Sequence, residues 1–399
     1  MKRYDSYKDS GVQWVGEIPN HWEIIKGKYC TKVICGLPFD SNKFTKEEGY
    51  IGLIRIRDIS NNVTDMNYMG KYPKEALVHT GEILIGMDGD FNIEKWKGDD
   101  ALLNQRVCKI VDTKTVLSNY MYYLLPRPLK CINDVTYSTT VKHLSTFDIA
   151  NLTLPLPPAS EQQAIASYLD KRCGEIDKAI AKQQKRIELL QELRQSIITN
   201  AVTRGINPDA SLKDSGVEWI GEVPSHWEVI PFKRIMRIKN GQDYKDFAEE
   251  DGYPVVGSGG CFAYCSKYIY DGEAILLGRK GTIDKPLYIN GKFWTVDTMF
   301  YAYPKTSSNI KFMYYQSLTI PFDKYKTSTA LPSMTQTDLG YNIFCVPPIG
   351  EQQAIASYLD KRCEEIDKAI AKQQKRIELL QELKQSIITE VVTGKRKVC

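Results

Sequence analysis

The chain has 399 residues, of which 42% are hydrophobic and 26% are charged, a balance typical of a globular protein long enough for two domains. This composition excludes a disordered, collagen-like or fibrous chain. Lysine and arginine number 53 against 49 aspartates and glutamates, so the net charge of +4 only weakly favours a polyanionic partner. No apolar run approaches the roughly 20 residues that span a bilayer, and we expect a soluble, cytoplasmic protein with no membrane contact.

Two segments of the chain occur twice. The long repeat, at 161–199, returns at 351–389 with changes only at Gly174/Glu364 and Arg194/Lys384. The short repeat, KDSGVQWVGEIPNHWEII at 8–25, returns as KDSGVEWIGEVPSHWEVI at 213–230. The sequence is therefore a tandem duplication of one half-molecule.

The segments between the repeats, 26–159 and 231–350, share little sequence. What is kept twice serves a common task, and what diverges distinguishes the two halves. The break between the halves falls near 204–212, where Gly, Asn and Pro are typical of a loop.

Each short repeat carries two tryptophans, Trp14 and Trp22 in the first copy and Trp219 and Trp227 in the second. Indole rings can stack on nucleic-acid bases. Residues that read different sequences should differ between the halves, however, and these are duplicated. We therefore predict that they anchor a core or an interface.

The first variable segment is predicted to contain short strands and turns with a few helices, and 50–60 and 81–89 have strand patterns. Loops at strand ends are where binding residues tend to lie. Arginine, asparagine and glutamine suit DNA base edges, whereas hydroxyls and lysine suit phosphates. On this chemistry the candidate DNA contacts are Arg55, Arg57, Asp88, Asp90, Asn104, Gln105, Arg106, Ser138, Thr139, Thr140 and Lys142.

The second variable segment has strand patterns at 253–260 and 272–281. The segment 272–281 looks equivalent to 81–89, because in both an apolar strand ends in a glycine-bounded loop. The candidate DNA contacts here are Ser258, Arg279, Lys280, Thr282, Lys326, Thr327, Ser328 and Thr329. As an alternative, all these loops are plain surface turns, and Asn104–Arg106 are the solvated face of one strand.

The long repeats are predicted to be helices, at 160–204 and from 351 onward, each roughly 60 Å long at 1.5 Å per residue. Ser160 fits the N-cap of the first, with Gln163 completing a capping box. A heptad seam predicts that the two helices pack on each other, antiparallel, although each could instead pack only on its own half. The seam residues are Leu169, Ile176, Ile180, Ile187, Leu190, Ile197, Leu359, Ile366, Ile370, Ile377, Leu380 and Ile387.

The charges on these helices mix both signs, which favours a spacer or a protein-docking surface over a DNA-binding helix. We therefore predict an α+β fold in which two mixed α/β domains, 1–159 and 205–350, are joined by antiparallel coiled-coil helices at 160–204 and 351–399. The duplication implies a pseudo-twofold arrangement.

Residue types that carry catalysis or bind metals are sparse. The ten cysteines contain no CxxC spacing and fit reduced thiols, and only four histidines occur. The sequence contains no GxxxxGK[ST], GxGxxG after a strand, HExxH, GxSxG or Asn-Pro-Pro-aromatic motif. We expect no catalytic residues, no metal site and no cofactor in this chain.

The pattern SGVxWxGExPxHWE, variable segment, PLPPxxEQQxIAxYLD and IDKxIxxxxxxIxxLxE, then the same again ending in VVTGK, resembles the DNA specificity subunit of type I restriction-modification systems. The resemblance spans nearly the whole chain. It implies two target-recognition domains that each read one half of a split site in double-stranded DNA. It also implies conserved helices that set the distance between the half-sites and bind two methyltransferase subunits.

The resemblance further implies that adenine methylation, translocation and cleavage, with S-adenosylmethionine, ATP and Mg, belong to methyltransferase and restriction/translocase partner subunits. It transfers no DNA contact residue by residue, because these lie in the most variable part of the family. A coiled-coil scaffold without DNA specificity would explain the helices but not two diverged domains inside duplicated frames. A self-contained restriction-methylation enzyme would need motifs that the chain lacks.

Overall fold

The computed structural model describes residues 3–135, 142–325 and 332–398. The chain forms two compact units, the first made of residues 1–182 with 376–399 and the second of residues 183–375. Each unit therefore combines one variable segment with the start of one long helix and the end of the other. Within the described ranges no helix is both long and apolar enough to cross a membrane.

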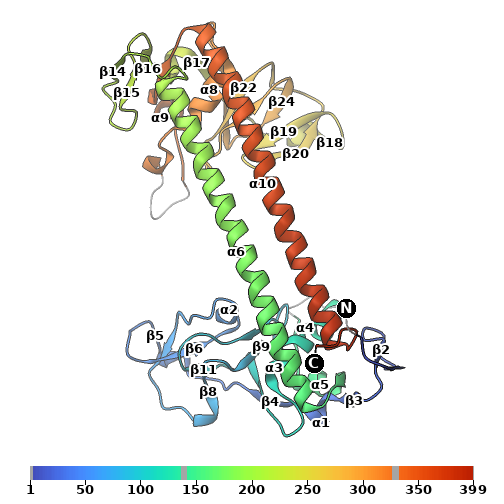
Figure 1. The fold of residues 1–399 in the computed structure, drawn as a ribbon. Coiled ribbons are helices and arrows are strands. Elements are labelled where there is room, and N and C mark those ends of the chain that lie inside the picture. The colour runs from blue at the N-terminus through green and yellow to red at the C-terminus, as the bar shows by residue number, and fades with distance from the viewer. Residues whose placement is uncertain (1–2, 136–141, 326–331, 399) are drawn as a thin grey trace. The chain divides into compact units, whose positions relative to one another are not determined.

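The first unit contains two main sheets (Figure 1). A four-stranded antiparallel sheet has the order β10-β9-β12-β4, and a five-stranded sheet has the order β5-β7-β6-β11-β8, in which β6 and β11 run parallel. The strands are β4 (Lys32–Cys35), β5 (Phe44–Thr45), β6 (Ile51–Ile54), β7 (Asn67–Tyr68), β8 (Leu77–Val78), β9 (Ile83–Gly86), β10 (Ile93–Lys95), β11 (Ala101–Leu103) and β12 (Val107–Val111). Around them lie the strand pairs β1 (Tyr7–Asp9) with β2 (Glu17–Pro19) and β3 (Glu23–Lys26) with β13 (Thr153–Leu156), and the helices α1 (Gly27–Cys30), α2 (Ile56–Ile59), α3 (Ser118–Leu124), α4 (Pro126–Val135) and α5 (Thr146–Asn151).

The second unit repeats this plan with a different sequence. Its sheets have the orders β17-β25-β22-β23 and β18-β20-β19-β24-β21, and β19 and β24 run parallel. The strands are β17 (Met236–Asn240), β18 (Ala248–Glu249), β19 (Tyr253–Gly257), β20 (Gly260–Cys265), β21 (Tyr270–Asp271), β22 (Ala274–Gly278), β23 (Leu287–Ile289), β24 (Lys292–Thr295) and β25 (Met299–Pro304). The pairs β14 (Leu212–Asp214) with β15 (Glu222–Pro224) and β16 (Glu228–Pro231) with β26 (Ile343–Val346) flank them, with helices α7 (Phe232–Ile235), α8 (Ile310–Ser317) and α9 (Gln336–Tyr341).

Strands β9 and β22 are the buried centres of the two four-stranded sheets. Every residue of both strands is buried, as expected for the continuous apolar runs Ile-Leu-Ile and Ala-Ile-Leu-Leu. In the first unit Gly86 pairs with Val107, and in the second Gly278 pairs with Met299. The equivalence of 81–89 and 272–281 is confirmed by these matching registers.

The long repeats form the continuous helices α6 (Ala159–Arg204) and α10 (Ile349–Val392). In the first unit the start of α6 packs on the end of α10, where Leu169 and Ile387 share one core. In the second unit the start of α10 packs on the end of α6, where Leu359 and Ile198 share another. The helices are therefore antiparallel in both units. The predicted seam residues are all buried or half-buried.

A buried glutamine of each long repeat clamps the variable segment that precedes it. The Gln162 side chain is fully buried; its Oε1 accepts the Leu117 N–H at 2.9 Å, and its Nε2 donates to the Thr115 and Pro157 carbonyls at 2.8 and 2.9 Å. Gln352 accepts the Asn309 N–H at 2.8 Å and donates to the Pro347 carbonyl at 2.8 Å.

A second duplicated contact joins each variable segment to its long helix. The Tyr123 hydroxyl donates to Asp170 at 2.7 Å, and the Tyr315 hydroxyl donates to Asp360 at 2.8 Å. Burial and these hydrogen bonds raise the pKa of both tyrosines, so the hydroxyls stay protonated donors. The long repeat thus keeps the residues that hold two unlike domains in the same pose on their helices.

The short repeats dock on the starts of the long helices. Trp22 donates from Nε1 to Glu161 at 3.0 Å, and His21 Nε2 lies 2.6 Å from the same carboxylate. In the second unit His226 Nε2 lies 2.8 Å from Glu351. Trp22 and Trp227 are buried in the two main cores, which confirms that they are core anchors, and Trp14 and Trp219 are half-buried against those cores.

Each short repeat also receives the end of the other half's helix. Gly394, just beyond α10, has a φ of 73°, and a Cβ there would lie 2.3 Å from Pro19 Cδ. Gly205, just beyond α6, has a φ of 76°, and a Cβ there would lie 3.2 Å from the Trp227 ring. Glycine suits both positions, because it adopts a positive φ without strain and leaves room for the side chain of Pro19 or Trp227.

Two local predictions are wrong. The apolar run at 50–60 is not one strand, because β6 ends at Ile54 and α2 begins at Ile56, with the Asp58 carboxylate accepting the Arg55 N–H at 2.9 Å. Ser160 is not the N-cap of α6. The helix begins one residue earlier, and the Pro158 carbonyl accepts the N–H groups of Glu161 and Gln162.

Candidate nucleic-acid interface

In the first unit three segments from distant parts of the chain meet at the loop that follows β9. Asp88 forms an isolated antiparallel bridge with His143, and the Gly89 N–H donates to the Lys142 carbonyl at 3.0 Å. On the other side the Met87 N–H donates to the Arg106 carbonyl at 2.9 Å. The loop after β9 is thus held between the turn before β12 and the segment before α5.

The second unit builds the same junction from other residues. Lys280 forms the bridge with Ser333, and the Gly281 N–H donates to the Pro332 carbonyl at 2.9 Å. The Arg279 N–H donates to the Thr298 carbonyl at 2.8 Å. Asp88 and Lys280 therefore occupy one structural position with opposite charge.

The parallel strands bring a fourth segment to the same edge. Ile54 of β6 pairs with Leu103 of β11, so Arg55 and Asn104 leave neighbouring strands at one edge of the sheet. In the second unit Val256 pairs with Thr295, and the turn holding Ser258 leaves β19 beside the turn that follows β24. Residues Asn104–Arg106 form the turn between β11 and β12 rather than one face of a strand.

Side chains at the first junction form a polar cluster open to solvent. The Asp88 carboxylate lies 2.7 Å from His143 Nδ1 and 3.6 Å from Arg106 Nε. The Arg106 side chain is 56% exposed, so the ion pair with Asp88 holds its guanidinium while leaving donors free for a ligand. Such a cluster offers both donors and acceptors to base edges in a major groove.

At the second junction Arg279 and Lys280 are exposed cations, and Asp297 is an exposed carboxylate on the adjoining turn. The Arg279 guanidinium donates from Nη1 to the Asp297 carbonyl at 3.3 Å, and Lys280 is exposed. The two units therefore present different chemistry on one backbone frame.

The remaining predicted residues of the first unit are placed as follows. Arg55 and Arg57 pair with carboxylates of their own loop: Arg55 Nε lies 3.2 Å from Asp58, and Arg57 Nη2 lies 3.4 Å from Asp65. Asp90 and Gln105 are exposed beside the junction. The Lys142 ammonium donates to the carbonyl and side-chain oxygens of Asn133.

Thr282 of the second unit is exposed, and its carbonyl closes the loop against Gly278, where a Cβ would lie 2.2 Å from the Thr282 oxygen. Seven predicted contacts lie outside the described residues: Ser138, Thr139, Thr140, Lys326, Thr327, Ser328 and Thr329. Contact with DNA stays a prediction for the whole set.

The sequence reasoning missed His143, Asp297 and Thr298, which lie at the two junctions. His143 ends the polar loop before the last strand of its segment, so its position was a usable signal. Asp297 and Thr298 could have been found only by aligning the turn before β25 with the turn before β12.

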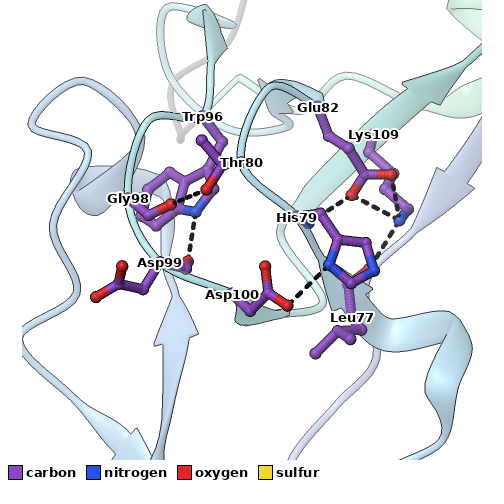
Figure 2. Close-up of polar contacts among 9 residues, drawn as sticks. All are labelled: Leu77, His79, Thr80, Glu82, Trp96, Gly98, Asp99, Asp100 and Lys109. Atoms are coloured by element: carbon purple, nitrogen blue, oxygen red, sulfur yellow. Dashed lines mark hydrogen bonds and ion pairs between the residues drawn. The ribbon is translucent and has the colours of Figure 1, made fainter.

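A further polar cluster in the first unit is structural (Figure 2). Lys109 is buried, and its ammonium donates to the Leu77 carbonyl at 2.8 Å and to both Glu82 oxygens at 2.8 and 2.9 Å. The backbone N–H of His79 donates to the same Glu82 carboxylate, and the ring Nδ1 of His79 lies 2.9 Å from Asp100. All three Lys109 donors are satisfied, so the cluster stabilises the loop. Within the described ranges no cluster of three or more His, Cys, Asp and Glu suits a metal ion.

The two matched frames, the divergent junctions and the paired long helices define a duplicated recognition protein. The chain belongs to the family of type I restriction modification DNA specificity domains, whose model matches residues 19–191 and 224–381. The two matches correspond to the two halves of the duplication.

Two named relatives indicate which proteins of the family are similar. The chain is 37% identical over 196 residues to the type I restriction enzyme EcoBI specificity subunit of Escherichia coli, a match covering 49% of this chain and 41% of that relative. It is 24% identical over 413 residues to the MjaVIII specificity subunit of Methanocaldococcus jannaschii, covering 96% of this chain and 94% of that relative.

The fold is also that of a solved protein. A chain from a structure concerned with complex assembly and conformational transition of the type I R-M system superposes with a TM-score of 0.70 at 16% identity, covering 94% of this chain and 98% of that one. At this identity the likeness concerns the fold alone.

Proposed function

We propose that this chain is the sequence-specific DNA-recognition subunit of a type I restriction-modification complex, and that it reads a bipartite target with one unit per half-site. One observation carries the proposal: the two units place Asp88, Arg106 and His143, or Lys280, Thr298 and Ser333, at the same positions of one backbone frame. A frame kept twice with its contact residues changed suits two different half-sites. A coiled-coil scaffold would need neither junction.

The chain supplies recognition, and partner subunits supply the chemistry. Adenine methylation with S-adenosylmethionine, and ATP- and Mg-dependent translocation and cleavage, belong to those partners. The absence from the sequence of the nucleotide-binding and methyltransferase motifs sought above supports this division of roles. DNA mixed with the purified chain should therefore be methylated only after a partner methyltransferase is added. Methyl transfer by the chain alone would refute the division.

The repeated helices carry a docking surface for two copies of one partner, a methyltransferase subunit. Leu189 and Leu193 on α6 are 52% and 47% exposed, and their copies Leu379 and Leu383 on α10 are also 52% and 47% exposed. Two exposed leucines one helical turn apart lie on the same face of the helix and form a small apolar patch. Burial of such a patch against a partner protein is favourable because it removes apolar surface from water. Two identical surfaces, one in each unit, suit two identical subunits.

The docking surface can be tested with two matched variants. Replacing Leu189 and Leu193 by Asp should lower the number of bound methyltransferase subunits from two to one, measured by native mass spectrometry. Replacing Leu379 and Leu383 should do the same, and the fourfold variant should bind none. Retention of two subunits by the folded fourfold variant would refute these surfaces.

The bipartite target can be tested in cells. Methylome sequencing with and without the gene should reveal a split, adenine-methylated motif that depends on the chain. Replacing residues 231–350 by the second variable segment of another family member should change one half of that motif and keep the other. Loss of both halves in a folded chimera would refute the modular assignment.

The junction of the second unit can be tested with one side chain. Arg279→Ala should weaken binding by about 1 to 3 kcal/mol with relaxed sequence preference if the guanidinium reads a base. If it holds a phosphate, the loss should be uniform across sequences, with a shallower salt dependence. Unchanged affinity would remove Arg279 from the interface.

A further inference from the structure

The second unit contains a basic groove outside the junction. It has a volume of about 540 Å³ and lies between β17, the residue that follows β25, and α9. Four cationic side chains line it, Lys233, Arg237, Lys239 and Lys305, together with polar groups of Gln336, Thr337 and Tyr341.

Positive charge in this groove is not neutralised by carboxylates. None of the lining residues is acidic, and within the described ranges Lys233, Arg237 and Lys239 make no ion pair. The Lys233 ammonium lies 3.4 Å from the centre of the Tyr341 ring and lowers the pKa of that tyrosine. Uncompensated cations in one hollow attract a polyanion.

Hydrogen bonds and backbone pairing join the elements that carry these cations. Lys305 donates from Nζ to the Lys233 carbonyl at 2.6 Å. Lys239 is exposed on β17, where its backbone pairs with Tyr301 of β25. Gln336 donates to the Ile238 carbonyl at 3.0 Å, which joins α9 to β17. The elements that form the groove are therefore tied together by these contacts.

The groove adjoins the junction of the same unit, where Lys280 meets Ser333. Ser333, the bridge partner of Lys280, lies three residues before Gln336, which begins α9 and lines the groove. At the far end of β17, the Gly241 N–H donates to the Met299 carbonyl, beside the turn of Thr298. A duplex that meets the junction would pass its backbone over elements that also form the groove.

The first unit lacks this concentration of charge. By strand register, Lys32 and Ile34 of β4 correspond to Arg237 and Lys239 of β17. Thr113 corresponds to Lys305, because its hydroxyl bonds the Cys30 carbonyl where the Lys305 N–H bonds the Ile235 carbonyl. Two of the four cationic positions are therefore neutral in the first unit.

We propose that this groove binds phosphates of the DNA backbone beside the second half-site, so that the second unit holds the duplex electrostatically more strongly than the first. The proposal rests on the proposed function, because it assumes that the ligand is the recognised duplex. Phosphate contacts position a protein on DNA without carrying sequence information. The groove therefore contributes affinity, and the junction contributes choice of sequence.

The test is the salt dependence of duplex binding by the full chain, measured by fluorescence anisotropy. Each phosphate contact contributes about 0.9 to the slope of log affinity against log salt. The variant Arg237→Ala/Lys239→Ala should therefore have a slope shallower by about 2, equally for target and non-target duplexes. The matched control is Lys361→Ala, which removes an exposed charge from α10 and should leave the slope unchanged.

The outcomes separate this proposal from the proposed function. A wild-type chain that binds no duplex at low salt refutes both. Binding by the wild type with the same slope in the double variant refutes the groove alone. In a second arm, inorganic phosphate replaces chloride at constant ionic strength. Extra displacement of DNA from the wild type but not from the double variant is expected, because phosphate then competes with the duplex for the groove. Phosphate that binds the wild type but not the double variant in calorimetry, and yet leaves the DNA affinity of the wild type unchanged, would assign the groove to free phosphate and overturn the assignment to DNA.

Discussion

Replacement of Gln162 by Ala tests how the variable segment is held on the long helix. The side chain is fully buried and makes three hydrogen bonds, to the Leu117 N–H and to the Thr115 and Pro157 carbonyls. Alanine removes all three and leaves the Leu117 N–H without its partner. A net contribution of about 1 kcal/mol per bond predicts that the free energy of unfolding falls by about 3 kcal/mol.

The second unit provides an internal scale for this loss. Gln352 makes two such bonds, to Asn309 and Pro347, so Gln352→Ala should cost about 2 kcal/mol. Gln163, the next residue in the first copy, is exposed, and its Nε2 donates to the Ser167 hydroxyl at 3.1 Å. Gln163→Ala should stay within about 0.5 kcal/mol of the wild type, because alanine favours the helix.

Urea denaturation and hydrogen exchange measure these changes. For a unit of this size about 3 kcal/mol corresponds to a melting temperature lower by roughly 6 to 12 °C. The Leu117 amide should also exchange faster in Gln162→Ala than in Gln163→Ala, because it loses its acceptor. If Gln162→Ala matched Gln163→Ala in stability and exchange, the clamp would not hold the domain.

Three further predictions concern the first unit and the cysteines. Burial raises the pKa of Glu161, but hydrogen bonds from Trp22, His21 and Tyr4 outweigh it and hold that pKa below its ordinary value. The ionised Glu161 carboxylate therefore stabilises the folded protein above the unfolded pKa of about 4.3, and this stabilisation is lost as the pH falls through the folded pKa. Glu161→Gln should flatten the decline in unfolding free energy between about pH 6 and pH 3. An equal decline in the variant and the wild type would contradict this. Lys109→Met should destabilise the first unit by about 3 kcal/mol, because it leaves the Glu82 carboxylate without its ion-pair partner. Adding Glu82→Leu should recover part of that loss, which a double-mutant cycle in urea measures. Iodoacetamide at about pH 8 should label the exposed Cys35, Cys131 and Cys261 quickly and the buried Cys108 and Cys345 slowly, because burial also raises the pKa of these two to about 12; rapid labelling of Cys108, read by mass spectrometry, would show that its strand opens.

The sequence alone predicted the features that depend on local pattern or on comparison of the chain with itself. The repeats revealed the duplication, and the heptads at Leu169 and Ile176 and their copies indicated two long helices that pack on each other. The equivalence of the loops after β9 and β22 followed from an apolar run bounded by glycines. These features are visible in local sequence patterns or in the comparison of one half of the chain with the other. The structure contains the two long helices and the matching strand registers.

Local pattern failed in two ways. Apolar and charged residues alternate from Ile54 to Arg57 as in a strand, but the Arg55 N–H donates to the Asp58 carboxylate, a contact within four residues, where the strand ends and a helical turn starts. At the interface, long-range contacts decided the outcome. His143 meets Asp88 across 55 residues of sequence, and the parallel pairing of β6 with β11 that places Arg55 beside Asn104 has no signature in either strand.

The sequence by itself determined that this protein is one plan written twice, because near-identical repeats and strong helix patterns are visible without coordinates. Only the tertiary structure decided that the compact units differ from the sequence halves, since each unit takes the end of the long helix that belongs to the other half. The physical reason is the antiparallel seam. It brings the glycine beyond α10 to Trp22 and the glycine beyond α6 to Trp227, so each core is completed by residues that the sequence places far away.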